Sequence, residues 1–241
     1  MLRELGAVRG LLLGADRQAP LRESEATGPP VLLLPGFLAG DWSLRPLAAH
    51  LASAGFRPQS SGIPRNVDCS EATVARLEVR LEQAAAAHAG PVAIVGHSRG
   101  GMFARVLARR RPDLVSGVVT LATPHRQPLA INPLLLAHTL AMGAAGSLGV
   151  RGLVSYSCAI GRCCAAFRRD LAAPVPAAVD TLSVYSRRDG VVDWRACVEP
   201  GGVQVEVATS HCGMATDPVT WHVVAARLQR VHGARDHMLA A

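Results

Sequence analysis

The ten residues VAIVGHSRGG, numbers 92–101, contain a serine whose surroundings favour chemistry. Four apolar residues of strand length precede Gly96, and helical apolar spacing follows Gly101, so Ser98 stands at a strand-to-helix turn in the pattern Gly-x-Ser-x-Gly. Glycine two positions before and two after the serine removes side chains that would clash with the strand and the helix. The turn therefore exposes the hydroxyl at the carboxyl end of a strand and at the N-terminus of a helix, where a nucleophile would be useful.

A serine hydroxyl becomes a good nucleophile only when a base accepts its proton and an acid orients that base. For a serine on such a turn, the acid comes next in the chain and the histidine last. His211 follows the predicted strand VQVEV, and we expect it to be the base for Ser98. Asp189, directly after the predicted strand DTLSVYS, and Asp193 are both candidate acids. His125 is the rival base, although it precedes both acids in the chain.

Phosphate binding is the competing interpretation of a glycine-rich strand-to-helix turn. A dinucleotide site would place G-x-G-x-x-G after the first strand, and the sequence has no such motif there. A phosphate-binding P-loop needs a lysine, and the chain contains none. The serine turn is therefore better explained by nucleophilic catalysis.

The elements that must position these residues alternate between apolar strands and amphipathic helices. Strands are predicted in VLLLPGF (31–37), VAIV (92–95), SGVVTLATPH (116–125), DTLSVYS (180–186) and VQVEV (203–207). Helices are predicted in 42–56, in 69–90 with Ser70 as cap, in 102–111, and in 217–232 with Asp217 as cap. This pattern predicts an α/β fold with a mostly parallel sheet and helices on both faces.

Domain organisation follows from length and from the positions of loop signals. We predict an N-terminal extension over residues 1–29 and a single domain over residues 30–241, because no linker or repeat divides the rest. The extension has Leu2, Leu5, Val8 and Leu12 at the spacing of a docking helix. Arg9 interrupts its apolar run, which disfavours a cleavable signal peptide and favours a cytoplasmic protein.

Residues 126–178 contain no strand pattern and are predicted to form a cap. Between Arg126 and Arg151 there is no Asp, Glu, Lys or Arg, a stretch long enough to span a bilayer. Prolines and polar residues interrupt its first half, and glycines interrupt its second. A cap over an apolar pocket therefore fits this segment better than a membrane span does.

Composition excludes some classes of partner. The chain has a net charge of +7, but its arginines are scattered and aromatic residues make up only 4%. Nucleic-acid binding is disfavoured, because it requires a basic stripe interleaved with aromatic residues.

The cysteine pattern predicts neither disulfides nor a metal site. The six cysteines are Cys69, Cys158, Cys163, Cys164, Cys197 and Cys212, and they contain no CxxC pair and no cysteine–histidine group with zinc spacing. A chain of 241 residues does not need disulfides to hold a core. Buried apolar thiols are the preferred interpretation, with disulfide bonding as the alternative.

At this point the sequence resembles the α/β-hydrolases, specifically bacterial serine esterases and lipases of the short, triacylglycerol-lipase-like kind. The resemblance covers about residues 30–232 and is carried by LLLPGF, VGHSRGG, LATPHRQP, VYSRRDGVVDW and SHCGM. It implies Asp189 as the acid, with Asp193 as a neighbour. It also implies an oxyanion hole formed by the backbone N–H groups of Phe37 and Arg99. Arg99 departs from the family, in which an apolar residue is usual.

The resemblance implies ester cleavage through an acyl-enzyme, without metal or cofactor. An acyltransferase or thioesterase on the same triad and a non-catalytic lipid- or ligand-binding relative are the alternatives. The expected partner is a small-molecule ester or lipid, with transient contact to a lipid interface, and the oligomeric state stays open. Candidate substrate-binding residues are Leu38, His97, His125, Leu134, Leu135 and Met142. Packing in an ordinary core accounts equally well for the leucines and methionine of the 126–178 segment.

Overall fold

The structure is a computed structural model that describes residues 28–199 and 202–239, with side chains as far as Gly233. The docking helix predicted from Leu2, Leu5, Val8 and Leu12 lies outside the described residues, as does nearly all of the 1–29 extension.

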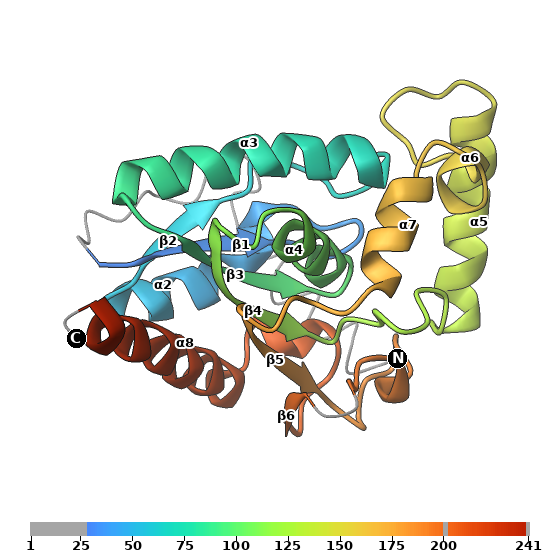
Figure 1. The fold of residues 1–241 in the computed structure, drawn as a ribbon. Helices are drawn as coiled ribbons and strands as arrows, with labels where there is room; N and C mark the ends of the chain where they lie inside the picture. The colour runs from blue at the N-terminus through green and yellow to red at the C-terminus, as the bar shows by residue number, and fades with distance from the viewer. Residues whose placement is uncertain (1–27, 200–201, 240–241) are drawn as a thin grey trace.

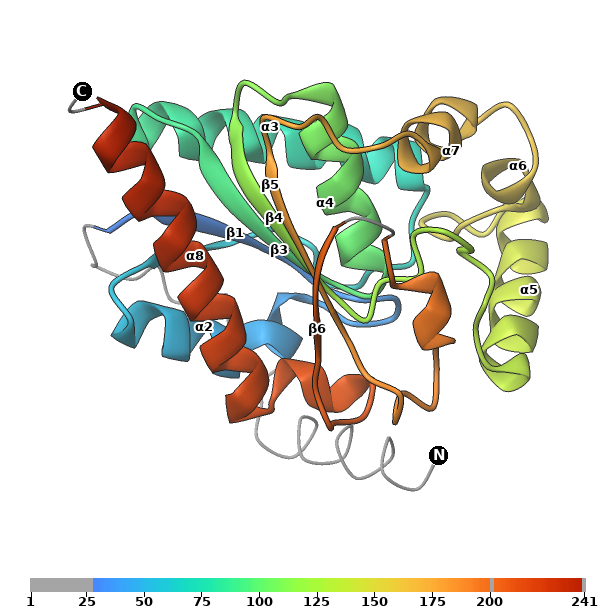
Figure 2. The same cartoon turned by 60° about the horizontal axis from the view of Figure 1, so that its bottom comes forward.

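Six strands in the described part of the chain form one sheet, in the order β2-β1-β3-β4-β5-β6 (Figures 1 and 2). Every neighbouring pair is parallel. The strands are β1 (Pro30–Leu34), β2 (Arg57–Ser60), β3 (Val92–His97), β4 (Val115–Leu121), β5 (Asp180–Tyr185) and β6 (Val203–Glu206). The predicted α/β fold with a mostly parallel sheet is confirmed.

β2 is the strand of this sheet that the sequence pattern does not predict. Its four residues, RPQS, contain no apolar run, and Pro58 lacks the N–H that a central strand needs. β2 lies at the edge of the sheet and pairs only with β1. An edge strand tolerates proline because one side of its backbone needs no partner, so tertiary pairing rather than local pattern forms this strand.

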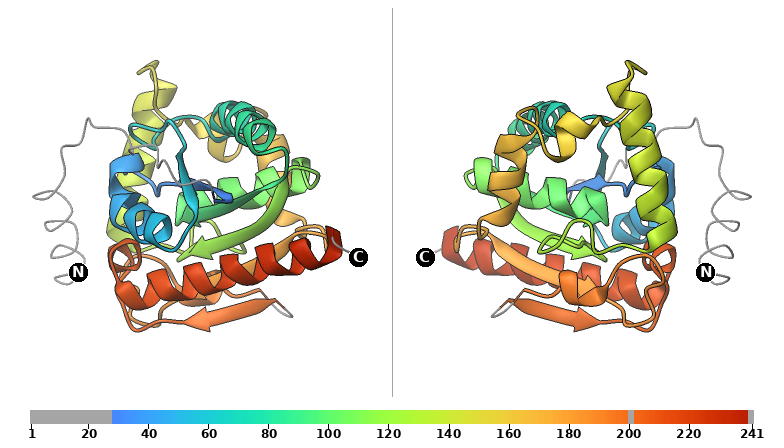
Figure 3. Two further views of the ribbon diagram at one scale, coloured as in Figure 1. Left: turned by 90° about the vertical axis from the view of Figure 1, so that its left-hand side faces the viewer. Right: turned by 90° about the vertical axis from the view of Figure 1, so that its right-hand side faces the viewer.

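The helices and 3-10 turns lie between and around these strands. In chain order they are η1 (Asp41–Leu44), α2 (Arg45–Ser53), α3 (Ser70–His88), α4 (Arg99–Arg110), α5 (Pro133–Ser147), α6 (Tyr156–Ala159), α7 (Ala165–Ala172), η2 (Trp194–Ala196), η3 (Cys212–Ala215) and α8 (Pro218–Leu239). α2 and α8 lie on one face of the sheet, and α3 and α4 lie on the other (Figures 1 and 3).

Each face of the sheet builds its own core, because successive strand residues point to opposite faces. In β3, Ala93 and Val95 join the core beneath α2 and α8, while Val92 and Ile94 join the core beneath α3 and α4. β1, β3 and β4 are buried at every position. Burial on both faces explains the continuous apolar runs in the sequence.

Helix ends follow the predicted capping residues with one exception. The Asp217 carboxylate accepts the Thr220 N–H at 2.8 Å, which caps α8 as expected. The prediction that Ser70 caps α3 is wrong. Cys69 occupies the cap position and Ser70 is the first helical residue. The Ser70 hydroxyl instead accepts a hydrogen bond from the Arg99 guanidinium at 3.0 Å, so a tertiary contact uses the group expected to cap the helix.

The 126–178 segment contains α5, α6 and α7 and no named strand. α7 packs against α4 and α3, whereas α5 packs against α6 at the edge of the molecule (Figure 1). Ile131 forms an isolated antiparallel bridge with Val192, which ties the start of the segment to the loop after β5. No helix within the described ranges is both long enough and apolar enough to cross a bilayer, and α5 has only 15 residues where about 20 are needed.

Candidate active site

Ser98 lies at a strained turn between β3 and α4. Its φ of 52° and ψ of −118° are unusual for a residue with a side chain, and its N–H donates to the Leu121 carbonyl of β4 at 2.7 Å. The glycines around it permit the close approach. A Cβ on Gly100 would lie 2.1 Å from the Leu34 carbonyl oxygen, and a Cβ on Gly96 would lie 2.5 Å from the Gly101 backbone. These distances confirm the steric reason predicted for glycine at positions 96 and 100.

The ends of β1 and β3 meet at the point where the sheet changes direction. The chain continues from β1 to β2 on one side and from β3 to β4 on the other, which is where α/β proteins bind ligands. The loop after β1 touches the serine turn, since a Cβ on Gly36 would lie 3.3 Å from the Ser98 Cβ and 3.0 Å from the His97 Nδ1. The sheet topology thus places this loop beside the serine.

Asn66 holds the loop after β1, and sequence reasoning missed it. Its buried side-chain amide donates to the Pro35 carbonyl at 2.8 Å, and its backbone N–H donates to the Ala39 carbonyl at 2.7 Å. Its carbonyl accepts the Leu38 N–H at 3.1 Å. The Ala39 N–H donates to the Gly36 carbonyl, so the N–H groups of Leu38 and Ala39 both have acceptors within the protein. Leu38 has a φ of 65°. No sequence signal marks Asn66, because its partners lie about 30 residues away in the chain.

Two backbone N–H groups flank the serine with no acceptor of their own. Among the described residues, none accepts the Phe37 N–H. Arg99 is the first residue of α4, where an N–H has no intrahelical acceptor. These are the two groups that the family resemblance implies for an oxyanion hole.

His211 and Asp189 form a buried hydrogen-bonded pair. The His211 Nδ1 lies 2.7 Å from the Asp189 Oδ2, and the two side chains are 7% and 2% exposed. A carboxylate only accepts hydrogen bonds, so Nδ1 donates the hydrogen of this bond, and the other ring nitrogen, Nε2, is the one that could act as a base. The other Asp189 oxygen accepts the N–H groups of Val191 and Val192, both at 2.8 Å. The carboxylate is therefore fixed in orientation by its own loop.

His97 connects this pair to the serine turn. Its Nε2 lies 3.0 Å from the His211 carbonyl oxygen, and the two rings are 4.9 Å apart between centroids. His97 is buried and immediately precedes Ser98. The structure therefore places this candidate substrate-binding residue against the backbone of His211, where it positions the loop after β6 beside the serine.

Asp193 lies in a different environment from Asp189. Its side chain is 46% exposed and accepts the Arg195 N–H at 3.0 Å, capping η2, with the Arg195 guanidinium 3.4 Å away. Its backbone N–H donates to the Ala130 carbonyl. The position of Asp193 fits the neighbouring, loop-holding role that the resemblance implies for it.

His125 is buried beside an ion pair between α4 and the loop after η2. The Arg105 guanidinium binds the Glu199 carboxylate through two contacts, at 2.6 and 3.1 Å. Burial, reinforced by the charge of Arg105, lowers the pKa of His125 from 6.5 to about 4. The hydrogen bond from Arg105 holds the pKa of Glu199 below its usual range. His125 is therefore a neutral ring packed against this pair at neutral pH.

The buried state of His125 makes stability depend on pH. Between about pH 6.5 and 4 the unfolded chain binds a proton that the folded chain excludes, so the free energy of unfolding falls as the pH is lowered through this window. The expected loss from this residue is about 3 kcal/mol. Urea denaturation at several pH values, with His125→Gln as comparison, measures it. Identical pH dependence in the two proteins would contradict the assignment.

The Arg99 side chain explains its departure from the family pattern. Its guanidinium donates to the Asn66 Oδ1 at 3.0 Å, to the Asp68 carbonyl at 2.5 Å and to the Ser70 hydroxyl at 3.0 Å. It also lies 5.7 Å from the centroid of the Phe37 ring. Burial lowers the pKa of Arg99 to about 10, so it stays cationic at neutral pH. Arg99 therefore joins the serine turn to the loop that precedes α3.

The remaining candidate pocket residues lie in two places. Leu38 is half-buried in the loop after β1. Leu134, Leu135 and Met142 lie on α5, where Leu134 is 60% exposed and the other two are half-buried. None of the three residues on α5 belongs to the buried core. Ordinary core packing was one of the two explanations drawn from the sequence, and it does not account for them.

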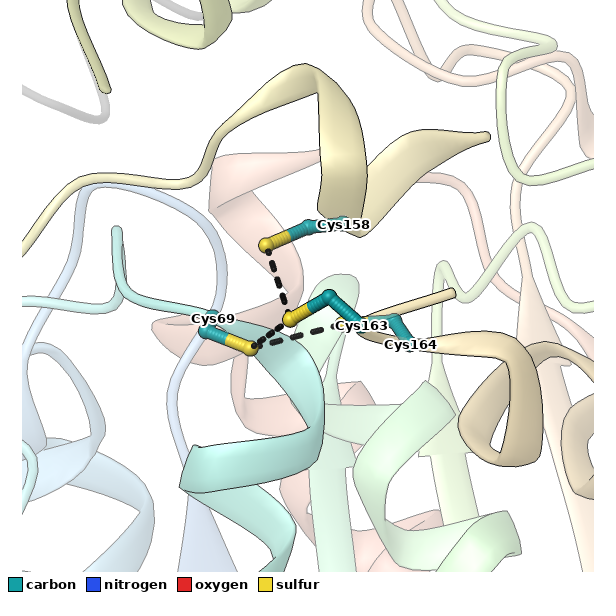
Figure 4. Close-up of side chains that lie close together, drawn as sticks. All are labelled: Cys69, Cys158, Cys163 and Cys164. Atoms are coloured by element: carbon teal, nitrogen blue, oxygen red, sulfur yellow. Dashed lines mark hydrogen bonds between the residues drawn. The ribbon is translucent and has the colours of Figure 1, made fainter. Parts of the chain in front are cut away.

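Four of the six cysteines come together in space, which their sequence spacing does not predict. Cys69, at the start of α3, meets Cys158, Cys163 and Cys164 of the 126–178 segment (Figure 4). All six cysteines lie among the described residues, and none of them is joined in a disulfide. The expectation of buried apolar thiols does not hold for Cys163, which is exposed. We refer to these four residues as the four-cysteine cluster.

Comparisons with known proteins agree with this architecture. The model of a family described as alpha/beta hydrolase fold matches residues 29–138. The mature Bacillus licheniformis lipase BlEst2 is similar in structure, with a TM-score of 0.65 and 16% identity, over 87% of this chain and 96% of that one. The Paleococcus ferrophilus monoacylglycerol lipase has a TM-score of 0.57 and 14% identity, over 87% and 96%. The putative non-heme bromoperoxidase BpoC of Mycobacterium tuberculosis H37Rv has a TM-score of 0.58 and 18% identity, over 87% and 94%.

The parallel sheet, the serine on its strained strand-to-helix turn and these matches define one class of protein. The chain has the α/β-hydrolase fold, which confirms the fold that the resemblance implied.

Proposed function

We propose that this protein is a serine hydrolase that cleaves carboxylic esters by transferring the acyl group to water. Ser98 is the nucleophile, His211 the base and Asp189 the acid. The main support for the proposal is the buried 2.7 Å contact between the His211 Nδ1 and Asp189. The His211 carbonyl also contacts His97, the residue directly before Ser98 at the strained turn. This pairing leaves the His211 Nε2 as the proton acceptor that a serine nucleophile needs.

The reaction proceeds through two acyl transfers. The Ser98 Oγ attacks the ester carbonyl carbon while its proton passes to the His211 Nε2, and Asp189 stabilises the resulting imidazolium. The N–H groups of Phe37 and Arg99 donate to the carbonyl oxygen as it becomes negative. Collapse of the tetrahedral intermediate releases the alcohol, which takes the proton from His211. Water, deprotonated in turn by His211, then attacks the acyl-serine, and the carboxylic acid leaves as His211 returns the proton to the Ser98 Oγ.

The structural neighbours support an ester as substrate. Two of the three described above are a lipase and a monoacylglycerol lipase, and their likeness to this chain extends over most of its length. An ester carbonyl also fits the chemistry of the site, because it needs one nucleophile, one base and donors for an oxyanion.

Exposed apolar side chains on and beside α5 support a substrate with an acyl chain. Leu134 is 60% exposed, Leu140 is 50% exposed and Leu148, at the end of α5, is 87% exposed. Apolar surface of this kind is suited to contact with an acyl chain or a lipid interface. We propose that the 126–178 segment is the cap over the acyl-binding side of the site.

Hydrolysis of p-nitrophenyl esters from acetate to palmitate tests the proposal. Release of p-nitrophenol that saturates with ester concentration is expected, and the chain length with the highest kcat/KM separates an esterase from a lipase. Added alcohol acceptors reveal an acyltransferase if transfer to them outcompetes hydrolysis. A folded protein that turns over no ester of the series would contradict the proposal.

Replacing Asn66 by alanine should lower kcat without a matching rise in KM. Asn66 touches no reacting atom in the proposed mechanism but holds the loop that carries the Phe37 N–H. Misplacing one oxyanion donor costs about 100- to 1,000-fold in kcat. Steady-state kinetics measure the split between kcat and KM. A loss confined to KM would show that Asn66 serves substrate binding instead.

A further inference from the structure

The four-cysteine cluster brings together thiols from distant parts of the chain. Cys69 precedes α3, Cys158 lies in α6, and Cys163 and Cys164 lead into α7 (Figure 4). The sulfur of Cys69 is 3.3 Å from that of Cys163 and 3.4 Å from that of Cys164, and the sulfurs of Cys158 and Cys163 are 3.9 Å apart. All four sulfurs lie within 4.8 Å of one another. The side chains therefore converge on one point.

These separations match the edges of a metal tetrahedron. Zinc–sulfur bonds of about 2.3 Å in a tetrahedral site place the sulfurs about 3.8 Å apart. A disulfide would bring one pair to about 2.05 Å and leave the other sulfurs unconstrained. Four sulfurs that all lie within 4.8 Å of one another are close to the arrangement that four thiolates adopt around Zn²⁺, a d¹⁰ ion that thiolates bind well.

The cluster lies where two helices begin, beside the hydroxyl group of Ser155. The Ser155 hydroxyl lies 3.5 Å from the Cys158 sulfur. Cys69 and Cys164 occupy the N-terminal cap positions of α3 and α7, which are the positive ends of two helix dipoles. Hydrogen bonds such as that between Ser155 and Cys158 orient the ligands of metal sites.

Two arginines supply positive charge and order the loop that carries the ligands. Arg168 donates to the Cys158 carbonyl at 2.8 Å and to the Gly161 carbonyl at 2.6 Å, which closes the loop between α6 and α7. The Arg99 guanidinium donates to the Asp68 carbonyl at 2.5 Å and to the Ser70 hydroxyl at 3.0 Å, on either side of Cys69. Four thiolates around Zn²⁺ carry a net charge of −2, and two guanidinium groups offset it.

We propose that the four-cysteine cluster binds one Zn²⁺ ion in a structural, tetrahedral tetrathiolate site. Binding replaces four S–H bonds by four zinc–sulfur bonds and releases four protons to water. The ion fastens α6 and α7 to the start of α3. It also supports the loop formed by residues 66–70, through which Arg99 reaches the serine turn. The proposal does not depend on the ester-hydrolase function.

Metal analysis of the whole protein tests the site directly. Protein purified under reducing conditions, incubated with ZnCl₂ and desalted should hold one zinc per chain by mass spectrometry of the metal. With CoCl₂ instead, it should show the intense visible bands of tetrahedral cobalt bound to thiolates. Cys158→Ser and Cys164→Ser should lose the metal and the cobalt spectrum. Cys197→Ser, which alters a buried thiol outside the cluster, should keep both.

A second measurement keeps the test decisive if the cluster variants fail to fold. Cys163 is exposed, so iodoacetamide should alkylate it in the metal-free protein. Zinc should suppress this reaction, and a chelator should restore it, with modification at Cys163 read by peptide mass spectrometry. If Cys197→Ser and the cluster variants retained equal amounts of zinc, the result would contradict the proposal.

Three outcomes would overturn the zinc site. The first is reduced, folded wild-type protein that binds neither zinc nor cobalt. The second is alkylation of Cys163 at the same rate with and without zinc. The third is a protein mass showing two disulfides within the cluster, each lowering the mass by two hydrogens. Ester hydrolysis is not a readout in any of these experiments, so a failed zinc site leaves the proposed function standing, and the reverse holds too.

Discussion

Ser98→Ala is expected to abolish ester hydrolysis, with a fall in kcat of about 10⁴- to 10⁶-fold. The alanine keeps the backbone turn but removes the oxygen that attacks the carbonyl carbon, so no acyl-enzyme can form. Initial rates on the best p-nitrophenyl ester measure the loss. Labelling by a fluorophosphonate probe, which reacts with an activated serine, should disappear in the same variant.

Ser53→Ala is a matched control for this substitution. Ser53 is exposed at the end of α2, and its hydroxyl donates only locally, to the His50 carbonyl at 2.8 Å. Its replacement should leave both the rate and the probe labelling unchanged. Undiminished labelling of the Ser98→Ala protein, by contrast, would show that another residue is the nucleophile. Circular dichroism of both variants should match the wild type, since neither hydroxyl supports the core.

Asp189→Asn is expected to lower kcat by about 10⁴-fold. An asparagine in this position can donate its amide hydrogen to the His211 Nδ1, which moves the ring proton to Nε2. The nitrogen facing the serine then cannot accept a proton. The asparagine oxygen can still accept the N–H groups of Val191 and Val192, so the loop should keep its conformation. Steady-state kinetics and thermal unfolding of the variant separate the loss of catalysis from a loss of stability.

Asp193→Asn is the matched control, because it makes the same chemical change four residues away. Asp193 caps η2 and is 46% exposed, and asparagine is also a good cap residue, so kcat should change by less than about tenfold. The opposite order of effects would transfer the acid role to Asp193. Equal, small effects at both positions would mean that His211 is not the base or needs no carboxylate.

The serine turn and the chain order of its candidate acid and base could be predicted from the sequence, because local structural constraints select the residues at these positions. Only glycine permits the close approach around Ser98, and a buried parallel strand leaves a continuous apolar run before it. The same local signals predicted the α/β class and five of the six described strands. They also offered Asp189 and Asp193 as candidate acids and His211 as the candidate base, in the expected chain order.

What local signals could not specify are contacts made between distant segments. β2 exists because β1 offers a free edge, and Asn66 matters because its partners are in the loop after β1. The sequence left both Asp189 and Asp193 as candidate acids and the resemblance favoured Asp189. The tertiary structure adds that the Asp189 carboxylate lies 2.7 Å from His211, whereas the Asp193 side chain is 46% exposed.

The cysteines are the clearest example of contacts that the local sequence does not predict. Their spacing along the chain contains no metal motif, because Cys69 lies 94 residues before Cys163. Sequence by itself therefore predicted five of the six described strands, the serine turn and the chain order of the candidate triad, because each strand and each turn depends on residues near each other in the chain. The tertiary structure alone decided which distant groups meet, since long-range contacts depend on how the whole sheet and its helices pack.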